Sequence, residues 1–131
     1  MPSLDTNVLV RFLVRDDPEQ HDRAKALVSA AAARRLFIPL TVLLETEWVL
    51  RSRYGIDRAS FVRILTGLLE TRELDFQEEA SVEGALSFYG EAKAGFADCL
   101  HLALSLAHER GPLMTFDRKA ARLPGAEIVP D

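Results

Sequence analysis

Short apolar segments alternate with longer helical segments along the whole chain, and this alternation limits the fold more than any other feature. Predicted strands lie at residues 3–4, 36–38, 74–76, 113–116 and 127–129. Predicted helices lie between them, at residues 8–13, 18–33, 41–55, 57–69, 79–89 and 97–110, with a helical turn or two at 118–123. Strands that are joined by helical crossovers pair in parallel. The sequence therefore predicts an α/β fold of three layers, with a central, mostly parallel sheet of four to five strands flanked by helices.

Local signals predict where several of these helices begin and end. Asp17, followed by Pro18, is a predicted N-cap, and Thr41 and Asp57 are predicted N-caps of the next two helices. Gly55 is the predicted end of the helix that starts near Thr41.

Length and composition point to one globular domain. The chain has 131 residues, of which 48% are hydrophobic and 27% charged, so disordered and disulfide-rich classes are excluded. No apolar run reaches the roughly 18 residues of a membrane span, and the start lacks the pattern of a signal peptide. The one cysteine, Cys99, cannot form an internal disulfide, which agrees with a reducing compartment. We expect a cytoplasmic protein without a membrane partner.

The charge balance bears on nucleic-acid binding. Sixteen basic and twenty acidic residues give a formal charge of −4. This argues against broad, sequence-independent adhesion to nucleic acid through a basic surface. It leaves room for local arginine patches, because a set of acids gathered around a metal ion would leave the remaining surface close to neutral.

Four acids follow predicted strands. In open α/β sheets the functional crevice lies at the carboxyl ends of the strands. Asp5 ends the first strand, Glu45 lies one turn into the helix after the second, Asp98 is in the first turn of a later helix, and Asp117 follows residues 113–116. We expect these side chains to meet at one edge of the sheet.

Each acid could also have a purely structural role. Asp5 and Asp117 are typical of loop starts, and Asp98 would gain about 0.3–1 kcal/mol at the positive end of its helix. Glu45 lies on a helix that is apolar nearly all round, where an unpaired carboxylate is costly. The helical pattern does not separate it from Glu47, and only the nearness of the strand end favours Glu45.

Converging carboxylates require a counter-charge. Two like charges about 4 Å apart repel by roughly 4 kcal/mol at an effective dielectric constant of 20. A divalent cation removes this repulsion, and oxygen ligands suit Mg²⁺ or Mn²⁺. Such an ion activates water and polarises phosphoryl oxygens. The pattern therefore favours a metal-dependent enzyme that acts on phosphate esters.

Four segments resemble the PIN-domain ribonucleases and, among them, the VapC toxins of toxin–antitoxin modules. They are residues 4–10 (LDTNVLV), 44–51 (LETEWVLR), 96–100 (FADCL) and 115–123 (TFDRKAARL). The resemblance implies one PIN domain over residues 1–131 and a toxin that cleaves RNA endonucleolytically. It also implies that Asp5 and Asp98 bind Mg²⁺ or Mn²⁺, with Glu45 and Asp117 binding directly or through water. It selects Glu45 over Glu47.

The resemblance extends to polar neighbours of these acids. Three polar residues match family positions beside the metal: Thr6, Asn7 and Thr115. The resemblance implies that they orient water or the carboxylates. The alternative is a structural role, as a helix cap or as a hydroxyl at the end of a strand. Many relatives carry an acid where this chain has Gly95, a departure that bears on a second metal ion more than on the first.

The resemblance further implies a homodimer and a groove for a cognate antitoxin, which would block the acidic pocket. The apolar side chains of the two helices at 41–55 and 57–69 would form this groove, although such side chains are more often core than interface: Trp48, Phe61, Ile64 and Leu68.

Three competing protein classes share part of this pattern. A haloacid-dehalogenase-like enzyme also begins with a strand-end aspartate, but it needs a second acid where this chain has Asn7. A receiver-like signalling domain would need adjacent acids after the first strand, which Asp5 and Thr6 do not supply. A non-catalytic binding module of the PIN fold is the third class.

His101 is expected to face solvent and Cys99 to lie in the core.

Overall fold

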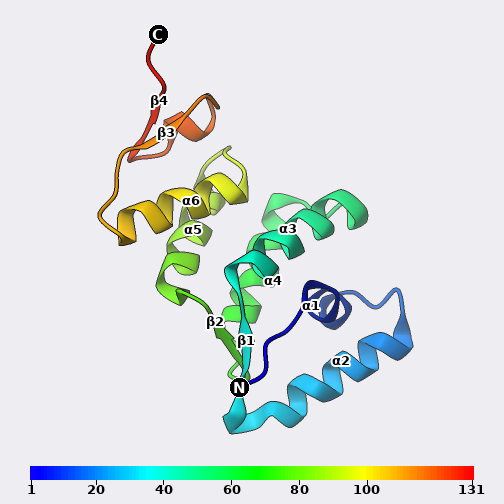
Figure 1. Cartoon of the computed structure of the whole chain (residues 1–131). Coiled ribbons are helices and arrows are strands. Elements are labelled where there is room, and N and C mark those ends of the chain that lie inside the picture. The colour runs from blue at the N-terminus through cyan, green and yellow to red at the C-terminus, as the bar shows by residue number, and fades with distance from the viewer. The chain divides into compact units, whose positions relative to one another are not determined.

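The structure is a computed structural model that describes all residues, 1–131. The chain folds into two compact units, Met1–Gln77 (unit 1) and Glu78–Asp131 (unit 2). Figure 1 shows the course of the chain from the N-terminus to the C-terminus. None of the helices is both long and apolar enough to cross a membrane. That residues 1–131 form one domain stays a prediction.

Unit 1 builds helices around a short parallel sheet. Its elements, in order, are α1 (Thr6–Leu13), α2 (Pro18–Ala31), the 3-10 helix η1 (Ala32–Arg34), β1 (Leu36–Ile38), α3 (Leu40–Tyr54), α4 (Arg58–Leu69) and β2 (Leu74–Phe76). Strand β1 pairs with β2 in parallel, with Leu36 opposite Leu74. Ser3 forms a parallel bridge to Phe37, and Leu4 N donates to the Phe37 carbonyl at 3.0 Å. The N-terminal segment therefore extends this sheet, and β1 lies in its middle.

Local signals set the helix ends of unit 1. The carboxylate of Asp17 accepts a hydrogen bond from Gln20 N at 3.1 Å, and that of Asp57 accepts one from Ser60 N at 2.8 Å. Gly55, with φ +62°, ends α3 in the left-handed conformation that glycine adopts without steric cost. These three predicted signals are confirmed. The predicted cap at Thr41 is wrong, because α3 already begins at Leu40, directly after Pro39.

The core of unit 1 consists of apolar side chains from its helices and from both strands. Helix α1 packs against α2 and α3 (Figure 1). The largest side chains that are almost fully buried in this unit come from the helices and from both strands: Leu9, Leu36, Ile38, Leu43, Leu50, Leu65 and Leu74. Burying each of these side chains contributes about 1.5–3 kcal/mol.

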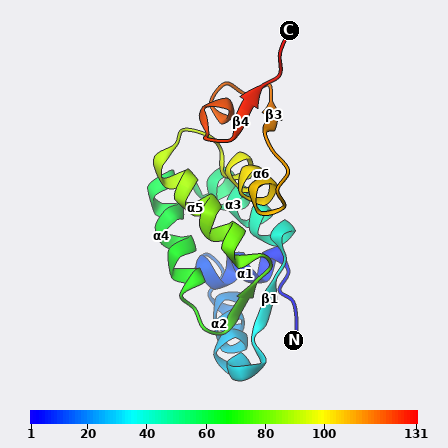
Figure 2. The ribbon, with the colours of Figure 1, turned by 90° about the vertical axis from the view of Figure 1, so that its left-hand side faces the viewer.

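Unit 2 is a helix pair followed by a second short sheet. It contains α5 (Glu79–Glu91), α6 (Phe96–Ala107), β3 (Leu113–Thr115), the 3-10 helix η2 (Ala120–Arg122) and β4 (Ala126–Ile128). Helix α5 lies alongside α6 (Figures 1 and 2), and the rings of Tyr89 and Phe96 meet edge to face at 5.5 Å. Strand β3 pairs with β4 in parallel. Gly125 has φ +103°, a backbone conformation that other residues rarely adopt, and a Cβ there would make a tight contact of 3.2 Å with Leu102 Cδ1.

The predicted α/β class with parallel strands is confirmed, whereas each sheet is smaller than predicted. The strands pair as β1 with β2 and β3 with β4 in two two-stranded sheets, the first of which gains only the single bridge from Ser3, where the sequence predicted one sheet of four to five strands. Each strand spans only three residues, so few ladder hydrogen bonds hold it. Pairing within a unit is decided by tertiary contacts, which a strand pattern does not record.

Candidate active site

Unit 1 brings Asp5, Thr6 and Glu45 together. Asp5 follows the segment that pairs with β1, and its carboxylate accepts a hydrogen bond from Thr6 N at 2.8 Å. The hydroxyl of Thr6, which is buried, donates to the Glu45 carboxylate. Glu45 belongs to α3, which starts directly after β1. Two of the predicted acids, one after the segment that pairs with β1 and one in the helix after β1, are therefore linked through Thr6. We call these three residues the Asp5–Thr6–Glu45 cluster.

The structure separates Glu45 from Glu47. Glu47 is 5% exposed and accepts a hydrogen bond from Arg51 Nε at 2.9 Å, so its charge is paired within α3. Glu45 is exposed and makes its contact with Thr6, in another helix. Of the two glutamates, only Glu45 is joined to the residue next to Asp5.

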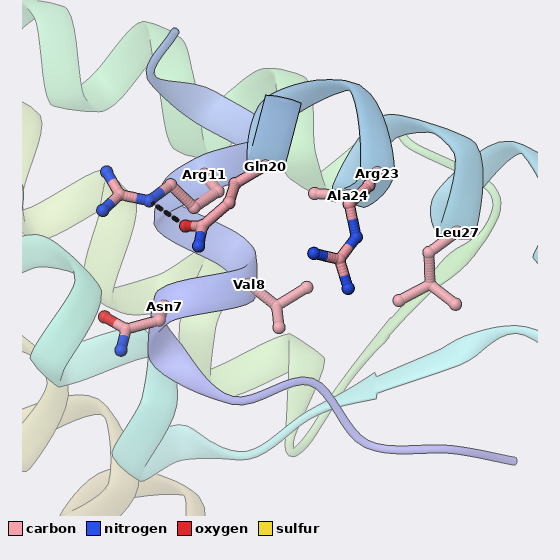
Figure 3. A pocket seen from close by; sticks show the side chains of 7 residues that line it. All are labelled: Asn7, Val8, Arg11, Gln20, Arg23, Ala24 and Leu27. Carbon is pink, nitrogen blue, oxygen red and sulfur yellow. Dashed lines mark hydrogen bonds between the residues drawn. The ribbon is translucent and has the colours of Figure 1, made fainter. Parts of the chain in front are cut away.

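A cavity of about 440 Å³ lies between α1 and α2. Figure 3 shows that Asn7 lines it at the beginning of α1, and that the guanidinium group of Arg23 reaches into it beside Val8. Arg11 also lines it, with Nε donating to Gln20 Oε1 at 2.7 Å (Figure 3). Of the residues that line this cavity, Asn7 follows the cluster residue Thr6 directly in the chain.

A hydrogen-bond network holds α1 against the end of α3. Asp16 accepts from the Tyr54 hydroxyl at 2.6 Å and from Arg11 Nη1 at 2.8 Å. The hydrogen bond from Tyr54 and the adjacent guanidinium group hold the pKa of Asp16 below its ordinary value. The same hydrogen bond raises the pKa of Tyr54, because ionisation would remove the donated proton. The network fixes the helix that Asp5 begins.

Unit 2 carries the other two acids. Asp98 is half-buried in the first turn of α6, where a carboxylate is stabilised by the helix dipole. Gly95 precedes the helix, and a Cβ added to it would lie 3.8 Å from Asp98 Oδ2, an ordinary contact distance. The fold therefore does not require glycine at this position.

The backbone around Asp117 holds its carboxylate in place. Asp117 Oδ1 accepts hydrogen bonds from Lys119 N at 2.8 Å and from Ala120 N at 2.9 Å. Thr115 Oγ1 accepts one from Asp117 N at 3.0 Å, so the hydroxyl that ends β3 orients the turn that contains the acid. This contact is the strand-end role that the sequence offered as the alternative for Thr115.

The model of the PIN domain family matches residues 3–126. The chain belongs to the PIN-domain family. The resemblance seen in the four sequence segments is therefore confirmed at the level of the family, and neither a haloacid-dehalogenase-like enzyme nor a receiver-like domain agrees with it. The comparison with curated proteins gives no match.

Two solved structures are similar over nearly the whole length of this PIN domain. VapC20 of Mycobacterium tuberculosis, described as a sarcin-ricin loop cleaving toxin, is 19% identical, covers 99% of this chain and 100% of its own, and has a TM-score of 0.44. A toxin–antitoxin complex from Klebsiella pneumoniae is 23% identical, covers 99% of this chain and 97% of its own, and has a TM-score of 0.38.

The donor chemistry of the PIN domain suits a hard divalent cation. All four acids offer carboxylate oxygens, which Mg²⁺ and Mn²⁺ prefer. Asp5 Oδ2, Glu45 Oε2 and Asp117 Oδ2 accept no hydrogen bond from the protein. In neither unit do three or more His, Cys, Asp or Glu side chains gather to hold a metal ion. Asp5 and Glu45 belong to unit 1, whereas Asp98 and Asp117 belong to unit 2.

Several side chains of the PIN domain differ from or add to the sequence prediction. Cys99 is fully buried and His101 is exposed, as predicted. Phe61 is core, but Trp48 is 56% exposed, so its prediction as a core residue is wrong: it lies on a face of α3 that this chain leaves uncovered. The sequence analysis did not predict that cationic side chains such as Arg23 line a cavity. The only feature of the sequence that pointed to such side chains was the excess of arginine over lysine.

Proposed function

We propose that this PIN domain is a metal-dependent endoribonuclease and the toxin of a VapC-type toxin–antitoxin module. The observation that carries the proposal is the Asp5–Thr6–Glu45 cluster, which joins the carboxylates of Asp5 and Glu45 through Thr6 in a chain of the PIN family. The proposed substrate is RNA, and the proposed reaction is hydrolysis of an internal phosphodiester bond.

The four acids are the proposed metal ligands. Asp5 and Asp98 would bind Mg²⁺ or Mn²⁺ directly, and Glu45 and Asp117 would do so directly or through water. When bound, such an ion supplies the positive charge that activates water and polarises a phosphoryl oxygen. Oxygens that the protein leaves without hydrogen bonds support this role for Asp5, Glu45 and Asp117.

Polar neighbours hold these carboxylates in position before the substrate binds. The Thr6 hydroxyl restrains Glu45, and the backbone N–H of Thr6 restrains Asp5. Thr115 acts on Asp117 through the backbone, and Asn7, exposed beside the cluster, is proposed to orient water. Groups positioned in advance lower the cost of organising the site in the transition state.

The deciding experiment compares cleavage of total RNA by wild type, Asp5→Asn and Asp57→Asn, each with Mg²⁺ or Mn²⁺ and with excess chelator. Asp57→Asn is the matched control, because Asp57 caps α4 and has no proposed role in catalysis. We expect discrete, metal-dependent products from wild type and the control only. Cleavage by folded Asp5→Asn at the wild-type rate would refute the site.

The alternative function is a non-catalytic binding module of the PIN fold. Absence of cleavage under every condition, by a folded protein that binds RNA, would decide for this alternative.

We further propose that the protein is a cytoplasmic homodimer and that a cognate antitoxin protein inhibits it. Trp48, 56% exposed on α3, supports an interface on this helix, because large exposed aromatic side chains are typical of interfaces. Light scattering should give twice the monomer mass of 14.6 kDa, and Trp48→Ala should lower the dimer fraction. A monomer mass for wild type at all concentrations would contradict the homodimer.

A further inference from the structure

Unit 2 contains a second cavity of about 440 Å³ that the acids do not line. It lies where the end of α5 and the segment after it meet η2. The side chains that matter here are Phe88, Glu91, Lys93, Lys119, Arg122 and Leu123. Its volume is within the range of about 300–1,000 Å³ that small-ligand sites occupy.

The lining of this cavity is cationic although the chain as a whole is acidic. Lys93, Lys119 and Arg122 face one acid, Glu91, whereas the whole chain carries −4. Lys119 and Arg122 form no ion pair with a carboxylate of the chain. Neighbouring like charges without counter-charges repel, and a bound anion removes that repulsion. The electrostatics therefore favour an anionic ligand.

The apolar part of the lining adds a second requirement. Phe88 and the buried Leu123 both line the cavity, so its lining combines an aromatic ring with an aliphatic side chain. Nucleic-acid bases stack on such rings, and cations beside them bind the backbone phosphates. A ligand that carries both a flat ring and a phosphate fits this combination better than a free phosphate does.

The cavity is close in the chain to both acids of unit 2. Lys119 belongs to the turn that the Asp117 carboxylate holds, through the hydrogen bond from Lys119 N at 2.8 Å. Lys93 lies in the segment that leads into α6, whose first turn contains Asp98. Lys119 therefore lies in the same turn as Asp117, and Lys93 lies in the segment just before the helix that contains Asp98.

We propose that this cavity binds one nucleotide of a single-stranded RNA. Its phosphate contacts Lys119 and Arg122, its base stacks on Phe88, and the strand continues from there to the acids of unit 2. The inference rests on the proposed function, since it assigns part of the path of the RNA substrate.

The test measures binding, not cleavage. A fluorescent single-stranded RNA of about 10 nucleotides, within the range of known site sizes, is titrated with full-length protein in the Asp5→Asn background, without divalent metal, at several salt concentrations. Lys119→Gln combined with Arg122→Gln is compared with Lys25→Gln combined with Arg15→Gln. The control pair removes the same charge from exposed residues outside the cavity.

We expect the cavity variant to bind roughly tenfold more weakly, the order expected for two exposed ion pairs. Loss of the one phosphate contact that both side chains share should also reduce the slope of log affinity against log salt by about 0.7. Phe88→Leu should weaken binding at least about fivefold with an unchanged salt slope, because it removes stacking and no charge.

Three results would overturn the inference. One is an equal loss of affinity and slope in the control pair, which would mean that only net charge matters. Another is an unchanged slope in the cavity variant. The third is equal binding of an aspartate-rich peptide with the same dependence on Lys119 and Arg122, which would assign the cavity to a protein partner. RNA cleavage by wild type alongside any of these results leaves the proposed function intact, whereas absence of both cleavage and binding refutes both.

Discussion

Thr46→Val should stabilise the protein. Thr46 lies in α3 between the two glutamates, its side chain is fully buried, and its hydroxyl has no hydrogen-bond partner. A buried hydroxyl without a partner costs about 1–3 kcal/mol relative to water. Valine has the same shape, a similar helix propensity and no polar atom, so the free energy of unfolding should rise by about 1–2 kcal/mol.

The expected change is large enough for a thermal or urea unfolding experiment. At about 2.1 cal/mol/K per residue, the unfolding entropy of this chain is about 0.28 kcal/mol/K, so Tm should rise by about 4–7 °C. Thr66→Val is the matched control, because Thr66 is exposed and its hydroxyl donates to the Val62 carbonyl at 2.7 Å. It should change the free energy of unfolding by less than about 0.5 kcal/mol.

The same substitution at Thr6 should have the opposite sign. Thr6→Val removes the hydrogen bond to Glu45, which should lower the free energy of unfolding by about 0.5–1.5 kcal/mol and reduce RNA cleavage. Glu45 is exposed, so water can replace the lost donor and limit the cost. Destabilisation by Thr46→Val, as large as that by Thr6→Val, would refute the reasoning, because it would show that the Thr46 hydroxyl is hydrogen-bonded in the folded protein.

Three further predictions concern charge. Arg51→Met leaves the buried Glu47 unpaired and should lower the free energy of unfolding in urea by about 1–2 kcal/mol, a loss that adding Glu47→Leu should largely restore. Hydrogen bonds from the Ser60 side chain and backbone lower the pKa of Asp57. The contribution of Asp57 to the stability of the folded protein is therefore full above the ordinary pKa of 3.8 and is lost as pH falls through the lower folded pKa. Asp57→Asn should lessen the fall in Tm below pH 3.8, and an unchanged dependence of Tm on pH would contradict this. Gly95→Asp, at a position with ordinary φ, should tighten Mn²⁺ binding in calorimetry, and unchanged affinity would show that residue 95 does not face the metal.

The sequence predicted most elements of the fold because the signals that begin and end them are local. Asp17, Asp57 and Gly55 act within a few residues, and the structure places helix ends at each of them. The size of the sheets was not predictable in this way. Three-residue strands carry little sequence signal, and their partners lie far along the chain, as Leu36 and Leu74 do.

The same distinction between local signals and tertiary contacts holds for the candidate site. The sequence by itself determined the family and the candidate acids, because strand-end positions and the four PIN segments can be read along the chain. Only the tertiary structure decided that Glu45 meets Thr6, that Glu47 is buried, and that Trp48 is exposed. The physical reason is that burial and hydrogen bonding depend on partners from other elements, and residues on the same helix with the same periodicity differ only in which partner the fold brings to them.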